Sequence, residues 1–252
     1  MSQTTPGDID DMRLSDAFAH HPELRNKIAD PLTSYFRTFS VEFLLKQHPH
    51  LAEHRDWFRS DANREHSRAQ VLAGRNGGDL WVFGYGSLMW DPALRFTSVR
   101  RAYVPGCARR FILLDDKGGR GTKEAPGLMA ALVRGAGCEG LAFRIAADDV
   151  NEETEILWRR EMVGHSYIPA FVPTLIDGEE KPALAFLADP SSEAVRPGLA
   201  RTDQVRFIAQ GAGFLGTSKA YLENIVSHFA HLGIVDEDCS ALLREVEDHL
   251  AA

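Results

Sequence analysis

Residues 84–88 offer the clearest opportunity for chemistry in this chain, because two glycines follow a short apolar run there. Residues 80–83 are all apolar and predict a buried strand that ends at Gly84. Gly84 and Gly86 allow the backbone to turn sharply and to come close to a ligand. The N–H groups of residues 85–88 can then converge on an anionic group or on a developing oxyanion. The sequence therefore predicts an anion-holding loop at this position.

A carboxylate at the end of a predicted helix is the candidate general acid or base. The helix covers residues 150–163, with an acidic first turn and with Arg159 and Arg160 in its last turn, as the helix dipole favours. One of its faces consists of Val150, Thr154, Leu157, Trp158 and Glu161. Apolar neighbours and the negative helix end both raise the pKa of Glu161 toward the range of acid–base catalysis. The alternative is a slightly rolled helix in which Glu161 pairs with an arginine at the rim.

Three other charged residues are secondary candidates. Glu152 lies in the first turn of the same helix, where a carboxylate is typical of a solvated surface. Arg109 and Arg110 fall on a predicted strand at residues 107–114, so their side chains alternate and one of them points inward. An inward arginine needs an anion, which is either a carboxylate of the substrate or, more commonly, one of the protein itself.

Several motif matches do not carry the chemistry that they suggest. Residues 211–216 match the pattern GxGxxG, but a dinucleotide site needs a preceding strand and a second parallel strand, and both flanks here favour helix. Ser87 does not lie in a GxSxG motif, so it is not a nucleophile at a strand–helix elbow. The histidines of residues 48–66 lack the spacing of a metal site. We expect neither a metal ion nor a cofactor.

Composition excludes several classes of function. The chain has 252 residues and a formal net charge of −8, which disfavours a nucleic-acid partner. No apolar run approaches the ~20 residues that span a bilayer, and no signal peptide is visible. Cys107, Cys138 and Cys239 are far apart and predict free thiols in a reducing cytoplasm. We expect a cytoplasmic protein that binds a small molecule; its oligomeric state stays open.

The elements that must position these residues fall into two regions. Residues 1–76 predict a helical extension, which ends in a glycine-rich linker at residues 74–78. Residues 77–252 begin as short strands, with hairpins predicted at residues 134–139 and 177–178. Helices are predicted over residues 150–163, 201–210, 217–232 and 236–250. This order predicts an α+β fold whose antiparallel sheet can close into a barrel.

Taken in order, the motifs resemble those of the ChaC-like γ-glutamylcyclotransferases. They are the run WVFGYGSLMW at residues 81–90, the segments at residues 104–106, 109–111, 119–124, 126–129, 157–162 and 213–217, and Tyr221 with Leu222. The resemblance covers about residues 80–250 and implies a small mixed β-barrel with packed helices, similar to the AIG2-like group. It also implies cleavage of glutathione to 5-oxoproline and cysteinylglycine without a metal or a cofactor. Residues 1–76 match no pattern of the family.

The resemblance also implies roles for single residues. The catalytic glutamate of the family falls on Glu161, which the helical face marks independently. The loop that would hold the γ-glutamyl group falls on Tyr85, Gly86, Ser87 and Leu88. Tyr221 matches a tyrosine near the site, and Arg109 or Arg110 would bind a substrate carboxylate together with the tyrosines. Lys123 stands where many members carry proline, which implies a looser loop.

Other interpretations stay open. A cyclotransferase of the same fold can act on other γ-glutamyl amines or amino acids, because the sequence does not show whether the pocket accepts cysteinylglycine. A non-catalytic sensor of γ-glutamyl ligands would keep the fold, although it would not need Glu161. An oxidoreductase that uses residues 211–216 would need the second strand that is missing there.

Overall fold

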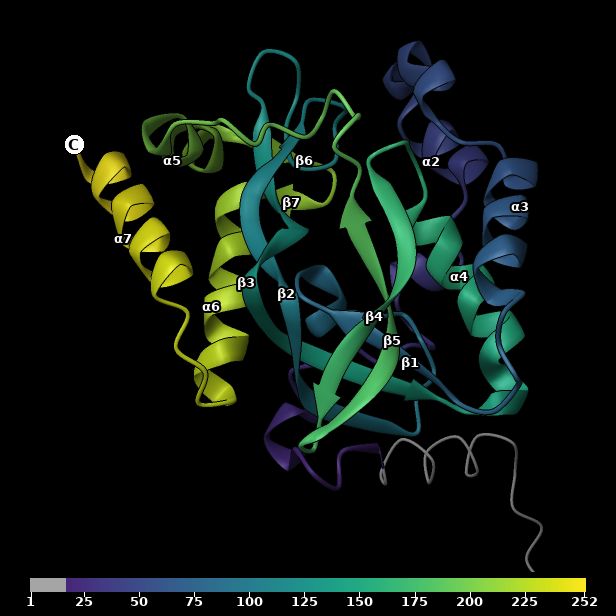
Figure 1. Ribbon diagram of the computed structural model, residues 1–252. Helices are drawn as coiled ribbons and strands as arrows, with labels where there is room; N and C mark the ends of the chain where they lie inside the picture. Colours follow the sequence, from purple (N-terminus) through teal and green to yellow (C-terminus); the bar gives the residue numbers. More distant parts are fainter. Residues whose placement is uncertain (1–16) are drawn as a thin grey trace, which may run out of the picture.

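The computed structural model describes residues 17–252 and has a closed β-barrel at its centre (Figure 1). The barrel strands are β1 (Leu80–Gly84), β2 (Ser98–Asp115), β3 (Gly127–Ile145), β4 (Tyr167–Ile176) and β5 (Glu179–Ala188). Their order is β1-β3-β2-β4-β5, with antiparallel neighbours, and a parallel pairing of β5 with β1 closes the ring. The α+β barrel expected from the sequence is confirmed.

The two longest strands, β2 and β3, pair along almost their whole length. The hairpin predicted at residues 134–139 is wrong, because β3 continues through this segment without a turn. Its glycines serve close packing between strands: a Cβ on Gly135 would collide with Ala108, and one on Gly137 would collide with the ring of Tyr103. Strands β2 and β3 connect instead through the glycine-rich loop at residues 116–126.

The second predicted hairpin, at residues 177–178, joins β4 to β5 and is confirmed. Asp177 and Gly178 both adopt left-handed backbone conformations, with φ values of 54° and 80°. Two consecutive residues with positive φ suit the tight two-residue turn that matches the twist of paired strands. This turn fixes the register of β4 and β5 along their full length.

Helices cover the barrel on two sides (Figure 1). On one side lies α4 (Val150–Glu161), whose Trp158 ring meets Phe186 of β5 with the ring centroids 5.4 Å apart. On the other side lie α5 (Arg201–Gln210), α6 (Ser218–His231) and α7 (Glu237–Ala251). All four helices begin and end within a few residues of the predicted bounds.

The segment with the GxGxxG match lies between two helices. It forms a small hairpin of β6 (Ala212–Gly213) and β7 (Gly216–Thr217), which leads from α5 into α6. The element directly before it is the helix α5 and not a strand, and among residues 17–252 β6 pairs with β7 alone. The segment therefore lacks the strand–helix–strand unit of a dinucleotide site.

Much of the N-terminal segment, residues 17–76, lies on the same side of the barrel as α4 (Figure 1). Its helical turns are η1 (Pro22–Leu24), η2 (Tyr35–Arg37), α2 (Val41–Gln47), η3 (Pro49–Trp57) and α3 (Asp61–Leu72). Arg68 of α3 donates a hydrogen bond to Oγ1 of Thr154 at 3.0 Å, so that α3 packs beside α4. Residues 1–16 of the predicted extension lie outside the described residues.

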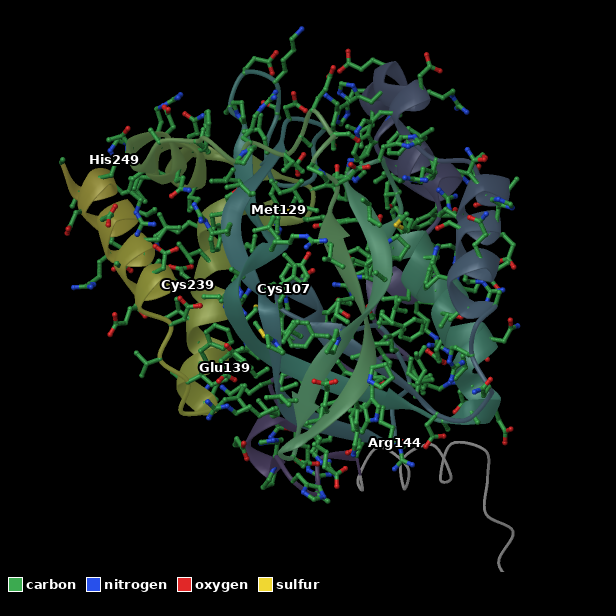
Figure 2. All side chains as sticks on the ribbon, in the orientation of Figure 1. Cys107, Met129, Glu139, Arg144, Cys239 and His249 are labelled. Atoms are coloured by element: carbon green, nitrogen blue, oxygen red, sulfur yellow. The ribbon has the colours of Figure 1, made fainter. Side chains whose placement is uncertain are left out.

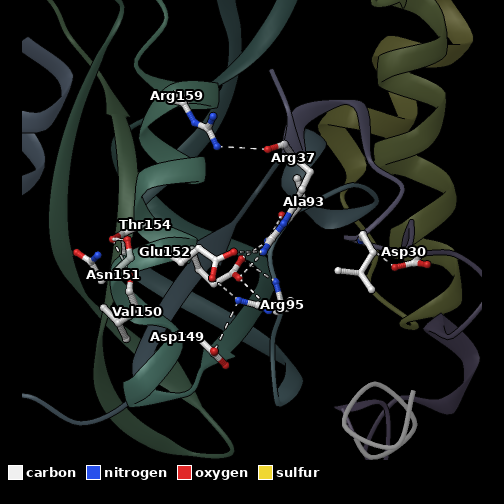
Figure 3. A network of polar contacts seen from close by, with 12 residues as sticks. Asp30, Arg37, Ala93, Arg95, Asp149, Val150, Asn151, Glu152, Thr154 and Arg159 are labelled. Carbon is white, nitrogen blue, oxygen red and sulfur yellow. Dashed lines mark hydrogen bonds and ion pairs between the residues drawn. The ribbon is translucent and has the colours of Figure 1, made fainter. Parts of the chain in front are cut away.

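A network of ion pairs fixes this segment to α4 (Figure 3). The carboxylate of Glu153 is fully buried and accepts hydrogen bonds from Arg37 at 2.9 Å and from Arg95 at 2.8 Å. Its exposed neighbour Glu152 pairs with the same two arginines. The network joins three parts of the chain, because Arg37 belongs to η2 and Arg95 to the loop between β1 and β2.

The three cysteines are free and buried. Figure 2 shows Cys107 on the barrel and Cys239 on α7. Burial raises the pKa of the Cys138 thiol to about 11 and that of the Cys239 thiol to about 12. Within residues 17–252, every helix is too short or too polar to cross a lipid bilayer.

Candidate active site

The loop predicted to hold an anion follows β1 and packs against α6. Ser87–Met89 form the short helix η4, in which the Met89 N–H donates to the Gly86 carbonyl at 2.8 Å. A Cβ on Gly86 would collide with the hydroxyl of Tyr221, which α6 carries. The Tyr221 ring is held by an edge contact with Trp90, with the ring centroids 5.4 Å apart. The structure thus brings the loop and Tyr221 together, and Gly86 has no room for a side chain.

Glu161 is the last residue of α4, and 13% of its side chain is exposed. Burial raises the pKa of its carboxyl, against the opposing effect of Arg160, whose Nε lies 3.0 Å from Oε1. The helix face inferred from the sequence is correct, because four of its members are buried: Val150, Thr154, Leu157 and Trp158. Glu161 is therefore a partly desolvated carboxylate next to a cation, which is an environment typical of a general acid or base.

Three tyrosine hydroxyls lie close enough to Glu161 for its charge to affect their ionisation, namely those of Tyr85, Tyr167 and Tyr221. Burial above all raises the pKa of these phenols, that of Tyr221 to about 12, so they stay protonated at neutral pH. Tyr85 donates its hydroxyl to the carbonyl of Phe186 at 2.9 Å. Tyr167 was not singled out from the sequence, because no spacing rule marks it and only the start of β4 brings it to Glu161.

Arg160 links the loop to the carboxylate. Only 3% of its side chain is exposed, and its Nη2 donates to the Ser87 Oγ at 3.0 Å. Its Nη1 donates to the carbonyl of Asp91, and its guanidinium lies 4.2 Å from the ring centroid of Phe36. One buried cation thus contacts both Glu161 and Ser87, so it fixes the catalytic candidate relative to the loop.

The sequence favours a helix-dipole role for Arg160, and its place in the site was missed. A sequence pattern could have indicated this role. A second face of α4, at helical spacing, is buried and consists of Glu153, Ile156, Leu157 and Arg160. Charged residues at both ends of an apolar stripe are rarely buried without a partner. The stripe could therefore have marked Arg160 as an internal residue that binds an anion.

The two arginines of β2 take different positions. Arg109 points inward, where it donates to the Tyr85 carbonyl at 2.7 Å and to the Glu139 carbonyl, and pairs with Asp236 at 2.7 Å. Arg109 therefore forms an internal ion pair and is not a free group for binding substrate. Arg110 is exposed and does not line the cavity next to Glu161. Arg109 therefore supports the loop from behind, through the backbone of Tyr85.

The remaining chemical candidates lie away from this site. Glu152 is 60% exposed and belongs to the ion-pair network, in agreement with the surface role favoured by the sequence. Within residues 17–252, no group of three or more histidine, cysteine, aspartate or glutamate side chains is arranged to hold a metal ion.

A cavity of about 590 Å³ lies beside Glu161, a size typical of sites for small molecules. Ser87, Arg160 and Glu161 line the part that contains the candidate chemistry. The barrel also contributes the loop that follows β2 and the segment at residues 163–167. Another wall comes from the N-terminal segment defined above. Of the predicted binding loop, Ser87 is the member that lines the cavity.

Comparison with known proteins shows the family to which the chain belongs. The model of the family described as ChaC-like protein matches residues 80–249. A glutathione-specific γ-glutamylcyclotransferase of Escherichia coli (strain K12) is 36% identical over 194 residues, which cover 76% of this chain and 84% of that protein. A protein of the same description from Schizosaccharomyces pombe is 29% identical over 191 residues, which cover 68% of this chain and 92% of that protein.

A solved structure shares the fold. The crystal structure of a selenomethionine-labelled γ-glutamyl cyclotransferase specific to glutathione from yeast matches with a TM-score of 0.62 and 20% sequence identity. The match covers 68% of this chain and 96% of that chain. The family model begins at residue 80, so the N-terminal wall of the cavity lies outside the residues that it matches.

Proposed function

The chain belongs to the family of ChaC-like proteins, and we propose that it cleaves glutathione by intramolecular cyclisation, releasing 5-oxoproline and cysteinylglycine. The observation that carries this proposal is the partly buried carboxylate of Glu161, which lines a cavity together with Ser87 and Arg160. Relatives that are described as glutathione-specific γ-glutamylcyclotransferases support the choice of substrate.

Glutathione carries its own nucleophile, the α-amine of its γ-glutamyl group. A new bond between the α-nitrogen and the γ-carbonyl carbon closes a five-membered ring, and the amide bond to the cysteine nitrogen breaks. The protein must hold the γ-glutamyl chain in the folded rotamer that brings these two atoms together. Such positioning can lower the barrier by several kcal/mol, because the reacting groups no longer have to find each other.

Glu161 is the proposed proton carrier. The α-amine is mainly ammonium at neutral pH, so a base has to take one proton before attack. Glu161 accepts that proton and then delivers one to the departing amine of cysteinylglycine. A pKa raised by burial suits both steps, while the ion pair with Arg160 keeps part of the carboxylate ionised.

The attack leaves a negative charge on the oxygen of a tetrahedral intermediate, and this oxyanion needs hydrogen-bond donors. The N–H groups of residues 85–88 are the proposed ones, since they follow a strand end and turn within a short helix. The Ser87 hydroxyl accepts from Arg160, which leaves its own proton free to donate toward the cavity. Tyr221 lies over Gly86 and keeps the loop in this conformation.

The test is the replacement Glu161→Gln, which preserves the shape of the side chain and removes the base. We expect release of 5-oxoproline from glutathione, followed by mass spectrometry, to fall by about 10²- to 10⁴-fold. Glu155→Gln is the matched control, because Glu155 is an exposed glutamate of the same helix. Normal turnover by a folded Glu161→Gln protein would contradict the assignment.

The same assay separates the alternatives. If the wild-type protein releases no 5-oxoproline from glutathione, other γ-glutamyl amines and amino acids are the next substrates. Silence across that panel would favour a binding or sensor role. We also propose that residues 77–252 form the cyclotransferase domain and that the protein works in the cytoplasm, since free cysteines are typical of a reducing compartment.

A further inference from the structure

The N-terminal segment contributes a wall to the cavity that contains Glu161. Its lining residues are Phe36, Phe39, Leu44, Trp57, Phe58 and Arg59. Five of the six are apolar, and Arg59 supplies the single positive charge of this wall. The family model begins at residue 80, so none of these residues belongs to the part of the chain that it matches.

Arg59 is fixed by hydrogen bonds to the residues that directly follow α4. Its backbone N–H donates to the Val163 carbonyl at 2.8 Å, and its Nε donates to the Gly164 carbonyl at 2.8 Å. The indole of Trp57 lies against Gly164 so closely that a Cβ there would collide with it. Gly164 follows Glu161 by three residues, so their Cα atoms are at most about 11 Å apart.

The guanidinium of Arg59 is available to an anion in the cavity. Across residues 17–252, no carboxylate lies within 4 Å of it, whereas Arg160 pairs with Glu161 and Lys117 pairs with Asp116. Asp189 and His165 are the titratable groups of the cavity lining that interact electrostatically with it, and Asp189 accepts a hydrogen bond from the Ser191 hydroxyl at 2.6 Å. Arg196, the other cation of the lining without such a partner, is exposed.

The leaving half of glutathione ends in a carboxylate. Cysteinylglycine is two residues long and spans at most about 7 Å. Glu161 and Arg59 line the same cavity, and Arg59 contacts residues two and three positions after Glu161. We propose that Arg59 binds this terminal carboxylate, so that the N-terminal segment selects γ-glutamyl substrates that end in a negative charge. The inference rests on the proposed function, because it assigns the far end of the same substrate. A guanidinium is suited to the task, since it offers paired donors to a carboxylate.

The test compares two substrates: glutathione and γ-glutamylcysteinylglycinamide, in which a neutral amide replaces the terminal carboxylate. For the wild-type protein we expect kcat/KM to be about 10- to 100-fold lower with the amide, mainly through a higher KM. Arg59→Met should lower kcat/KM for glutathione by a similar factor and should change the value for the amide by less than about threefold. Arg59→Lys should restore part of the preference.

Arg55→Met is the matched control, because Arg55 is an exposed arginine of the same segment that does not line the cavity. Equal use of both substrates by the wild-type protein would overturn the inference, and so would an equal loss for both substrates in Arg59→Met. If Arg59→Met does not fold, the wild-type comparison can still overturn the inference, and Arg59→Lys tests the assignment to Arg59. Failure of the wild-type protein on both substrates would instead contradict the proposed function.

Discussion

At the scale of residues, two opposing effects set the acidity of Glu161. Burial disfavours its anionic form, and Arg160 at 3.0 Å favours it. Arg160 is itself held by Ser87 and by the carbonyl of Asp91, so it cannot move away when Glu161 takes up a proton. Arg160 therefore holds the Glu161 carboxylate in a fixed position and limits the rise of its pKa.

Replacing Arg160 should change the pH dependence of catalysis. In Arg160→Met the lowering effect on the pKa of Glu161 disappears, so its pKa rises further. Because the ionised carboxylate of Glu161 is the proposed base, the acidic limb of kcat/KM should move to higher pH. A pH–rate profile with glutathione measures this shift. Arg110→Met is the control, because Arg110 is exposed and lies away from the cavity, and it should leave the profile unchanged. A profile of Arg160→Met equal to that of the wild type would argue against an effect of Arg160 on the pKa of Glu161.

The sequence could identify some of these residues and not others. Glu161 was recognisable because the face of one helix ends in a carboxylate, which is a local pattern. Tyr167 and Arg59 were not recognisable, because the barrel and the N-terminal segment bring them to Glu161 from separate elements. One of Arg109 and Arg110 was correctly expected to point inward. Which of the two does so, and its pairing with Asp236, could not be read from the sequence, because Asp236 follows Arg109 by 127 positions.

At the scale of elements, Glu153 joins the N-terminal segment to the barrel domain. Its carboxylate is fully buried and accepts hydrogen bonds from Arg37 and Arg95. A buried carboxylate with two cationic partners is costly to disrupt, because the cations then lose their counter-charge. The network therefore holds η2 against α4, next to the cavity wall that η2 provides.

We expect Glu153→Gln to lower the free energy of unfolding by about 3–5 kcal/mol. Glu152→Gln changes the neighbouring carboxylate in the same network, but this side chain is 60% exposed, so its effect should be about 0–1 kcal/mol. Urea denaturation of both variants measures the difference. Similar losses in the two variants would mean that burial of Glu153 does not contribute to the strength of the contact.

Local sequence patterns predict the hairpin at residues 177–178 correctly and the one at residues 134–139 wrongly, and the neighbouring elements explain why. Asp177 and Gly178 are predictable, since a tight hairpin needs positive φ at both positions. Positions 135 and 137 are also glycines, but for another reason. Ala108 and Tyr103 of β2 approach them so closely that a Cβ would collide. Only the neighbouring strand distinguishes a turn glycine from a packing glycine.

At the scale of the whole molecule, the site should reduce stability. The pKa of Glu161 in the folded protein is raised above the ordinary value of 4.5. At a pH between the ordinary pKa and the raised one, the native state therefore binds more protons than the unfolded chain. The free energy of unfolding therefore falls as the pH rises through that window. Glu161→Gln cannot ionise, and it should have a higher Tm than the wild type at pH 7. The difference in Tm should vanish at a pH below the ordinary pKa of glutamate. An equal or lower Tm of the variant at pH 7 would contradict this account.

The burial of all three thiols has a consequence for the lifetime of the protein in a cell. An enzyme that destroys glutathione depletes the reductant that protects its own cysteines. With pKa values of about 11 and 12, the thiols of Cys138 and Cys239 form almost no thiolate at neutral pH, and the thiolate is the form that oxidants attack. We therefore expect its activity to persist as the redox buffer declines.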